Sequence, residues 1–137
     1  MRVLSAVVAM LVAYAPAVLI LNRRPQPDGT ILSAPFVRYD NSNAFMTYPV
    51  IPGATADDKD HREQSTLILY EDDKPLGPAH STNRDVLVEG GGRYLFWHHN
   101  ANMLLFSTSD NSDPNTNGRT YRISDPGARD PFQVQRR

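Results

Sequence analysis

The sequence predicts an all-β fold, a small antiparallel sandwich or barrel, preceded by one N-terminal transmembrane helix. An uncharged apolar segment spans residues 3–21, and after it short runs rich in Val, Ile, Leu, Tyr, Phe and Thr alternate with turn residues. Beyond residue 29 no segment shows a convincing helical period. We therefore divide the chain into a transmembrane anchor (1–22), a linker (23–29) and an all-β domain (30–137).

The composition narrows the class of protein. The chain has 137 residues and a formal net charge of −1, with charges of both signs scattered along it. A nucleic-acid binder needs a basic face to neutralise phosphates, so we expect no nucleic-acid partner. The absence of cysteine excludes disulfides, thiolate zinc sites and a cysteine nucleophile.

The apolar segment has the length of a membrane span. At 1.5 Å per residue a helix over residues 3–21 covers roughly 28 Å, about the thickness of a hydrocarbon core. A cleaved signal peptide is the alternative, since Ala13-Tyr14-Ala15 has a small-residue cleavage pattern. Signal peptides have shorter apolar regions, of about 7–15 residues, and Pro16 would directly follow the cut. We interpret the segment as an uncleaved single-pass anchor.

One face of this anchor carries small side chains, which lets helix backbones approach closely in a lipid bilayer. The candidate helix-packing residues are Ser5, Ala9, Ala13 and Ala17, spaced by four. The alternative is that alanine is simply common in such spans. The positive charges on the two sides are nearly balanced, and we place the protein in the bacterial inner membrane with its β domain in the periplasm.

Seven runs after the linker have the composition of strands. They are 30–39, 44–51, 65–72, 84–90, 92–99, 102–109 and 118–124. Alternation places Leu67 and Leu69 on one face of their strand, and opposes Phe96 to Trp97 on another. We expect a hairpin at 100–102, a proline turn at 73–77 and a solvated charged loop at 57–63.

No catalytic motif is complete, so we expect a protein that is not an enzyme. Gly90-Gly91-Gly92 leads into a strand-like run rather than a helix, which favours a tight turn over a phosphate-binding loop. His98 and His99 are adjacent and point to opposite faces of a regular strand, so they cannot readily share a metal. No Gly-x-Ser-x-Gly elbow is present.

The stretch 106–121 is dense in Asp, Asn, Ser and Thr. Asp113-x-Asn115-x-Asn117-Gly118 fits the first half of a calcium-loop pattern, but position twelve is Ser124 rather than Glu. The calcium candidates are Asp110, Asp113, Asn115 and Asn117; the alternative is a turn held by its own side-chain bonds. No other cofactor is expected. As a binding loop we select Asp110, Asn111, Asp113, Asn115, Asn117 and Arg119.

Three ordered blocks between Leu69 and Tyr121 resemble a known small bacterial all-β domain. The blocks are LYEDDKPLGPAHS, EGGGRYLFW and LLFSTSDNSDPNTNGRTY. In the resembling proteins the domain accompanies glycosyltransferases and methyltransferases of cell-surface polysaccharides. The resemblance covers about fifty residues and implies a binding or scaffolding module, including one for glycans. It attaches no catalytic role to individual positions, and no transferase domain lies beside it in these 137 residues.

Two functions follow as expectations. The first is an accessory or structural subunit of a larger membrane-protein complex, such as a respiratory or photosynthetic assembly, with integral membrane proteins and the lipid bilayer as partners. The alternative is a membrane-tethered carbohydrate-binding module of the cell envelope. Its candidates for stacking on sugar rings are Tyr94, Phe96, Trp97 and Tyr121. The alternative is that most of these aromatic residues form the β core, and the strand setting of Trp97 and Phe96 favours the core for these two.

Overall fold

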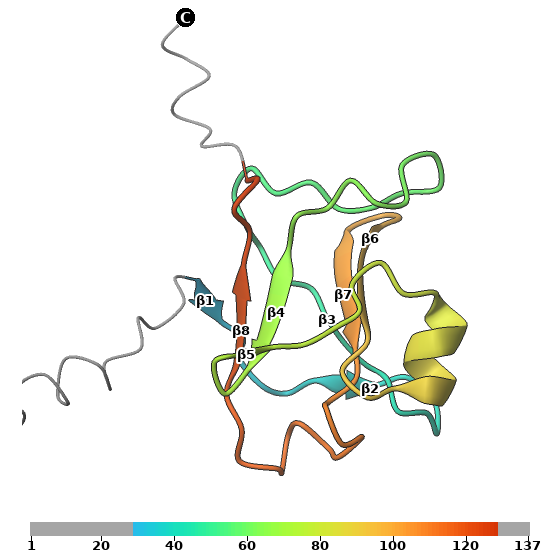
Figure 1. The fold of residues 1–137 in the computed structure, drawn as a ribbon, viewed down its shortest axis with the longest axis vertical. Helices are drawn as coiled ribbons and strands as arrows, with labels where there is room; N and C mark the ends of the chain where they lie inside the picture. Colours follow the sequence, from blue (N-terminus) through green and yellow to red (C-terminus); the bar gives the residue numbers. More distant parts are fainter. Residues whose placement is uncertain (1–28, 129–137) are drawn as a thin grey trace, which may run out of the picture.

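The structure, a computed structural model, describes residues 29–128 and is mostly β in this range. Its eight strands form two four-stranded antiparallel sheets (Figure 1). The first sheet has the order β1 (Thr30–Ile31), β8 (Tyr121–Ser124), β4 (Ile68–Glu71), β5 (Lys74–Pro75). The second has the order β2 (Val37–Arg38), β3 (Phe45–Thr47), β7 (Asn102–Phe106), β6 (Tyr94–His98). The all-β prediction is confirmed at this level.

The predicted membrane anchor at 1–22, with its small-residue face, lies outside the described residues. So does the linker except for its last residue, Gly29. From residue 29 to residue 128, the chain contains no helix with the length and apolar character needed to cross a membrane.

One hydrophobic core is shared by the two sheets. Leu67 and Leu69 are buried while Thr66 is exposed, which confirms the alternation expected for this strand. Phe106 of β7 lies at the centre, 5.3 Å from the ring of Phe36 and 5.5 Å from the ring of Tyr121. Edge-to-face and tilted aromatic contacts of this kind stabilise a core beyond the area they bury. The buried members are Phe36, Phe45, Ala56, Leu67, Leu69, Tyr94, Phe96, Leu104, Phe106, Tyr121 and Ile123.

The prediction of a strand at 84–90 is wrong, because this segment forms a short π-helix, η1 (Asp85–Glu89). The Thr82 side-chain oxygen accepts the Asp85 N–H at its start, and Gly90, with φ 60°, donates its N–H to the Asp85 carbonyl at its end. Val86 is fully buried against Leu105, on the face of the second sheet opposite the main core. Five residues are too few for periodicity to separate a helical turn from a strand.

One turn and one further strand also differ from expectation. The proline turn expected at 73–77 lies earlier, because Asp72 and Asp73 have φ 47° and 64° and connect β4 to β5 as a two-residue hairpin loop. Pro75 is tolerated in β5 because this strand is at the edge of its sheet. The run 30–39 forms two short strands, β1 and β2, rather than one. The hairpin expected at 100–102 is confirmed between β6 and β7, with His98 paired to Asn102.

Candidate functional site

The 106–121 loop is built around the buried carboxylate of Glu71, the last residue of β4. Glu71 is only 7% exposed and pairs with Tyr121 across the first sheet. Its Oε2 accepts from the Tyr121 hydroxyl at 3.0 Å and from the Ser109 N–H at 3.2 Å. Its Oε1 accepts from the Ser109 hydroxyl at 2.5 Å and from Arg119 Nη1 at 3.2 Å. A carboxylate is tolerated in a buried position only when donors of this kind replace water.

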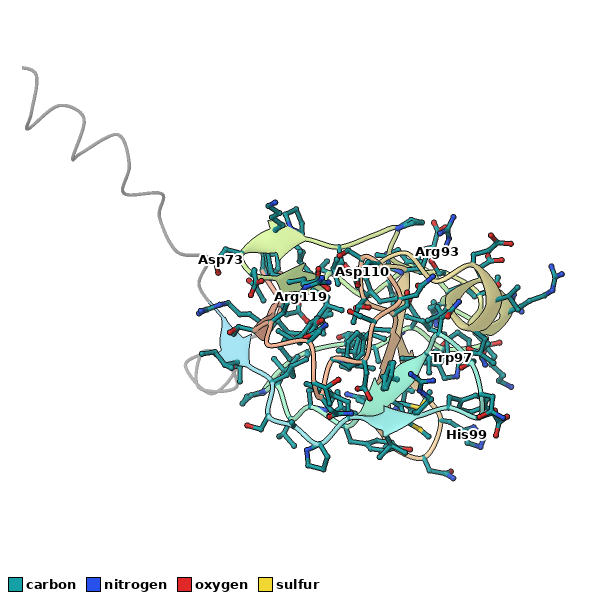
Figure 2. The ribbon with its side chains drawn as sticks, turned by 90° about the horizontal axis from the view of Figure 1, so that it is seen from below. Asp73, Arg93, Trp97, His99, Asp110 and Arg119 are labelled. Carbon is teal, nitrogen blue, oxygen red and sulfur yellow. The ribbon has the colours of Figure 1, made fainter. Side chains whose placement is uncertain are left out.

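Arg119 extends this network to Asp110, and Figure 2 shows the two side chains beside each other. Nη1 lies 2.9 Å from Asp110 Oδ1 and Nη2 lies 2.7 Å from Oδ2, a bidentate pair. Ser112 donates to Asp110 Oδ1 through both its hydroxyl and its N–H. The bonds from Arg119, and then those from Ser112, hold the pKa of Asp110 well below its ordinary value.

The glycine run packs against the same loop. The Gly91 N–H donates to Asn111 Oδ1 at 2.7 Å, and a Cβ on Gly90 would lie 2.0 Å from that oxygen. Gly90 and Gly91 also have φ near +60°, a region that favours glycine. The expected tight turn is therefore present, and it joins the second recognisable block of the sequence to the third.

The remaining loop candidates are bonded to the protein itself. Asn115 binds both backbone groups of Phe36, accepting its N–H at 2.7 Å and donating to its carbonyl at 2.9 Å. Asn117 donates to the Tyr121 hydroxyl at 2.7 Å, and Asp113 accepts the Asn115 N–H at 2.8 Å. The structure thus shows the self-bonded turn that was one of the two interpretations of this stretch.

The calcium site stays a prediction. Over residues 29–128 no three His, Cys, Asp or Glu side chains lie close enough together to hold a metal ion. Both carboxylate oxygens of Asp110 are bonded to Arg119, and the amides of Asn115 and Asn117 contact Phe36 and Tyr121. A calcium ion at these residues would have to displace those bonds.

Of the four aromatic candidates for sugar stacking, three belong to the core. Tyr94, Phe96 and Tyr121 are buried between the sheets. Trp97 pairs with Met103 across β6 and β7, on the opposite face of the second sheet, and is half-buried. Trp97 is therefore the one of the four that a ligand can reach.

Two hollows flank Trp97 and share it as a wall. The first has a volume of about 320 Å³ and the second of about 280 Å³. Figure 2 shows Trp97 and His99 towards one end of the domain, with Asp110 and Arg119 nearer its middle. The first hollow is lined by Arg62, His80, Ser81, Thr82, Asn83, Leu95, Trp97 and Met103. The second is lined by Asp58, Lys59, Asp60, Trp97, His98 and His99. We call the pair of hollows the Trp97 groove.

A hydrogen bond between the buried carboxylate of Asp57 and His80, which the sequence analysis did not predict, lies behind this groove. The prediction of a solvated loop at 57–63 is wrong for Asp57, because this residue is 0% exposed. Its N–H donates to the Phe96 carbonyl and its carbonyl accepts the His98 N–H, so its backbone extends the second sheet beside β6. Its Oδ1 accepts the Ser65 N–H at 2.7 Å and its Oδ2 lies 2.6 Å from His80 Nδ1. Asp57 and His80 are 23 residues apart, and no local pattern connects them.

The depressed pKa of Asp110 predicts an acid-dependent loss of stability. The unfolded chain takes up the proton first, near its ordinary value of 3.8, so the ionised carboxylate stabilises the fold above that pH and less below it. We expect Asp110→Asn to lower the free energy of unfolding at pH 7 and to flatten its rise between about pH 2 and 5. Urea unfolding across this range measures both effects. Asp40→Asn, outside the network, is the charge-matched control, and identical profiles for the two variants would contradict the prediction.

Comparison with known proteins identifies no relative of this chain. No protein-family model matches the chain, and neither the curated proteins nor the solved structures give a match.

Proposed function

We propose that this chain is a non-catalytic binding protein that acts as an accessory or structural subunit of a larger membrane-protein complex. Residues 1–22 tether it to the bacterial inner membrane, and the β domain lies in the periplasm. Its partners are integral membrane proteins, and a respiratory or photosynthetic assembly is the class of complex that fits a small anchored subunit. One observation on the β domain carries the proposal, an apolar strip along the exposed edge strand β2.

The strip consists of four exposed apolar side chains on two neighbouring segments. Val37 and Tyr39 are 56% and 41% exposed, and Tyr48 and Val50 are 60% and 89% exposed. β2 pairs only with β3 and ends its sheet, so no strand of the described residues covers its outer edge, although Asn115 occupies the N–H and C=O of Phe36 just before it. Single exposed apolar side chains are common, whereas a group of them beside an open strand edge suits protein docking. We name Val37, Tyr39, Tyr48 and Val50 the β2 strip.

The 106–121 loop supports the same proposal in a different way. Its side chains bond to Glu71, Phe36 and the glycine turn, so the loop has a fixed shape before any partner arrives. A preformed surface loses little conformational entropy on binding. The Asp110 side chain is 52% exposed, which leaves it within reach of a partner at the rim of such an interface.

Co-purification tests the accessory-subunit proposal. The tagged full chain is extracted in mild detergent, and its partners are identified by mass spectrometry. We expect stoichiometric recovery of an integral membrane complex, and Val37→Lys with Tyr39→Lys should reduce it by at least about tenfold, since charges would replace the apolar contact. Ile31→Lys is the matched control, because Ile31 is 55% exposed on β1 of the other sheet.

The anchor provides a second arm of this experiment. Ala9→Leu with Ala13→Leu replaces two small side chains of the helix-packing face by large ones. This double variant should also reduce recovery, because close helix approach needs small side chains. Recovery that is unchanged in both double variants, or a chain that purifies alone, would contradict the proposal.

The Trp97 groove favours a second function, a membrane-tethered carbohydrate-binding module. A half-buried tryptophan with polar groups on both sides suits a sugar ring, which has an apolar face and a rim of hydroxyls. Arg62, Asn83 and His80 lie on one side of Trp97, and Lys59 and Asp60 lie on the other. The two hollows together provide room for more than one sugar unit.

A glycan array tests this second function. The full chain in detergent should bind a subset of glycans, and Trp97→Ala should abolish that binding because it removes the stacking surface. Trp97→Phe retains an aromatic face and should retain part of it, while thermal melting checks that both variants remain folded. Failure to bind any glycan, or equal binding by Trp97→Ala, would exclude the module.

A further inference from the structure

The first hollow of the Trp97 groove contains a histidine held in one orientation. Asp57 Oδ1 already accepts the Ser65 N–H, and a carboxylate offers only acceptors, so His80 Nδ1 is the donor to Asp57 Oδ2. His80 has φ 54°, a left-handed conformation that non-glycine residues keep where their surroundings hold them. A buried carboxylate behind the ring fixes which nitrogen faces a ligand. The second nitrogen, Nε2, has no hydrogen bond to any residue in 29–128.

Other polar groups around the hollow retain bonding capacity. The Thr82 oxygen accepts the Asp85 N–H, which leaves its hydroxyl proton to donate. Arg62 lines the hollow and forms no ion pair within the described part of the chain. A guanidinium with no carboxylate partner is suited to bind one from a ligand, in a planar bidentate arrangement. The first hollow therefore combines an aromatic wall, hydroxyl-binding groups and a cation that has no ion-pair partner within residues 29–128.

We propose that the first hollow binds an acidic saccharide unit, a uronic acid, whose carboxylate pairs with Arg62 while a ring hydroxyl bonds His80 Nε2. This inference rests on the carbohydrate-binding function proposed above and specifies its ligand class. The ring of the sugar lies against Trp97, which separates the two hollows. The carboxylate belongs in the first hollow because Asp58 and Asp60 line the second and would repel it.

The test compares a saccharide with its methyl ester, which keeps the sugar rings, removes the negative charges and adds one methyl group to each carboxyl. Trigalacturonic acid and its fully methyl-esterified form are titrated into the full chain in detergent micelles, and calorimetry or saturation-transfer NMR measures affinity. We expect the acid to bind about tenfold more tightly than the ester, because one hydrogen bond between Arg62 and a charged carboxylate changes affinity by about this factor. Arg62→Gln should remove this difference, whereas Arg84→Gln, an exposed position outside the hollow, should leave it intact. His80→Gln should weaken both ligands.

The outcomes separate this inference from the function beneath it. If the acid and the ester bind with equal affinity while Trp97-dependent glycan binding is preserved, the inference of an acidic ligand is wrong. The proposal of a carbohydrate-binding module is then unaffected. A charge preference that survives Arg62→Gln also overturns the inference of an acidic ligand. Absence of any glycan binding overturns both. A thermal melt for each variant, close to that of the wild type, shows that the loss of affinity is local.

Discussion

The carboxylate of Glu71 is the constraint around which the domain is arranged. It lies at the end of β4, almost without contact with water, and a charge in that position is costly unless hydrogen-bond donors surround it. The donors Ser109, Arg119 and Tyr121 all belong to the stretch 106–121, between 38 and 50 residues away from Glu71 in the sequence. Each of these residues must therefore be in place for Glu71 to be tolerated. One carboxylate thereby ties a strand end, a long loop and the neighbouring strand β8 together.

This dependence gives a physical reason for residues in the three sequence blocks between Leu69 and Tyr121. The first block supplies Glu71, and the third supplies Ser109, Asp110 and Arg119. The second supplies the glycine turn, whose backbone fits against Asn111 only because it lacks side chains. The blocks are thus parts of one polar network. The network gives the loop a fixed shape.

A second buried carboxylate, Asp57, has a comparable role at the Trp97 groove. It fixes the ring of His80 and at the same time continues the second sheet beside β6. The two surfaces proposed to bind partners are the β2 strip and the Trp97 groove. Both contain residues of the second sheet. The proposed protein-docking surface and the proposed saccharide site therefore lie on different parts of the same domain. The Glu71 network holds the 106–121 loop in place.

Local pattern predicted the strands well where alternation was clear, as for Leu67 and Leu69. It failed at η1, where five residues, Asp85–Glu89, have the composition of a strand but cover the outer face of a sheet. It also predicted a self-bonded loop as one interpretation of 106–121, because Asp and Asn side chains commonly bond nearby backbone. The partners themselves could not be predicted: Asn115 binds Phe36 79 residues away, and Asp57 binds His80 through tertiary structure alone. The membrane anchor stays a prediction.

A double-mutant cycle between Glu71→Gln and Arg119→Gln tests the central role of this carboxylate most directly. Urea unfolding of the wild type, both single variants and the double variant isolates the coupling, since the loss of the Arg119–Asp110 pair cancels between the two halves of the cycle. We predict that Glu71→Gln alone costs about 1–3 kcal/mol and that the coupling energy is about 1 kcal/mol or more. Additive effects, within about 0.5 kcal/mol, would contradict the account.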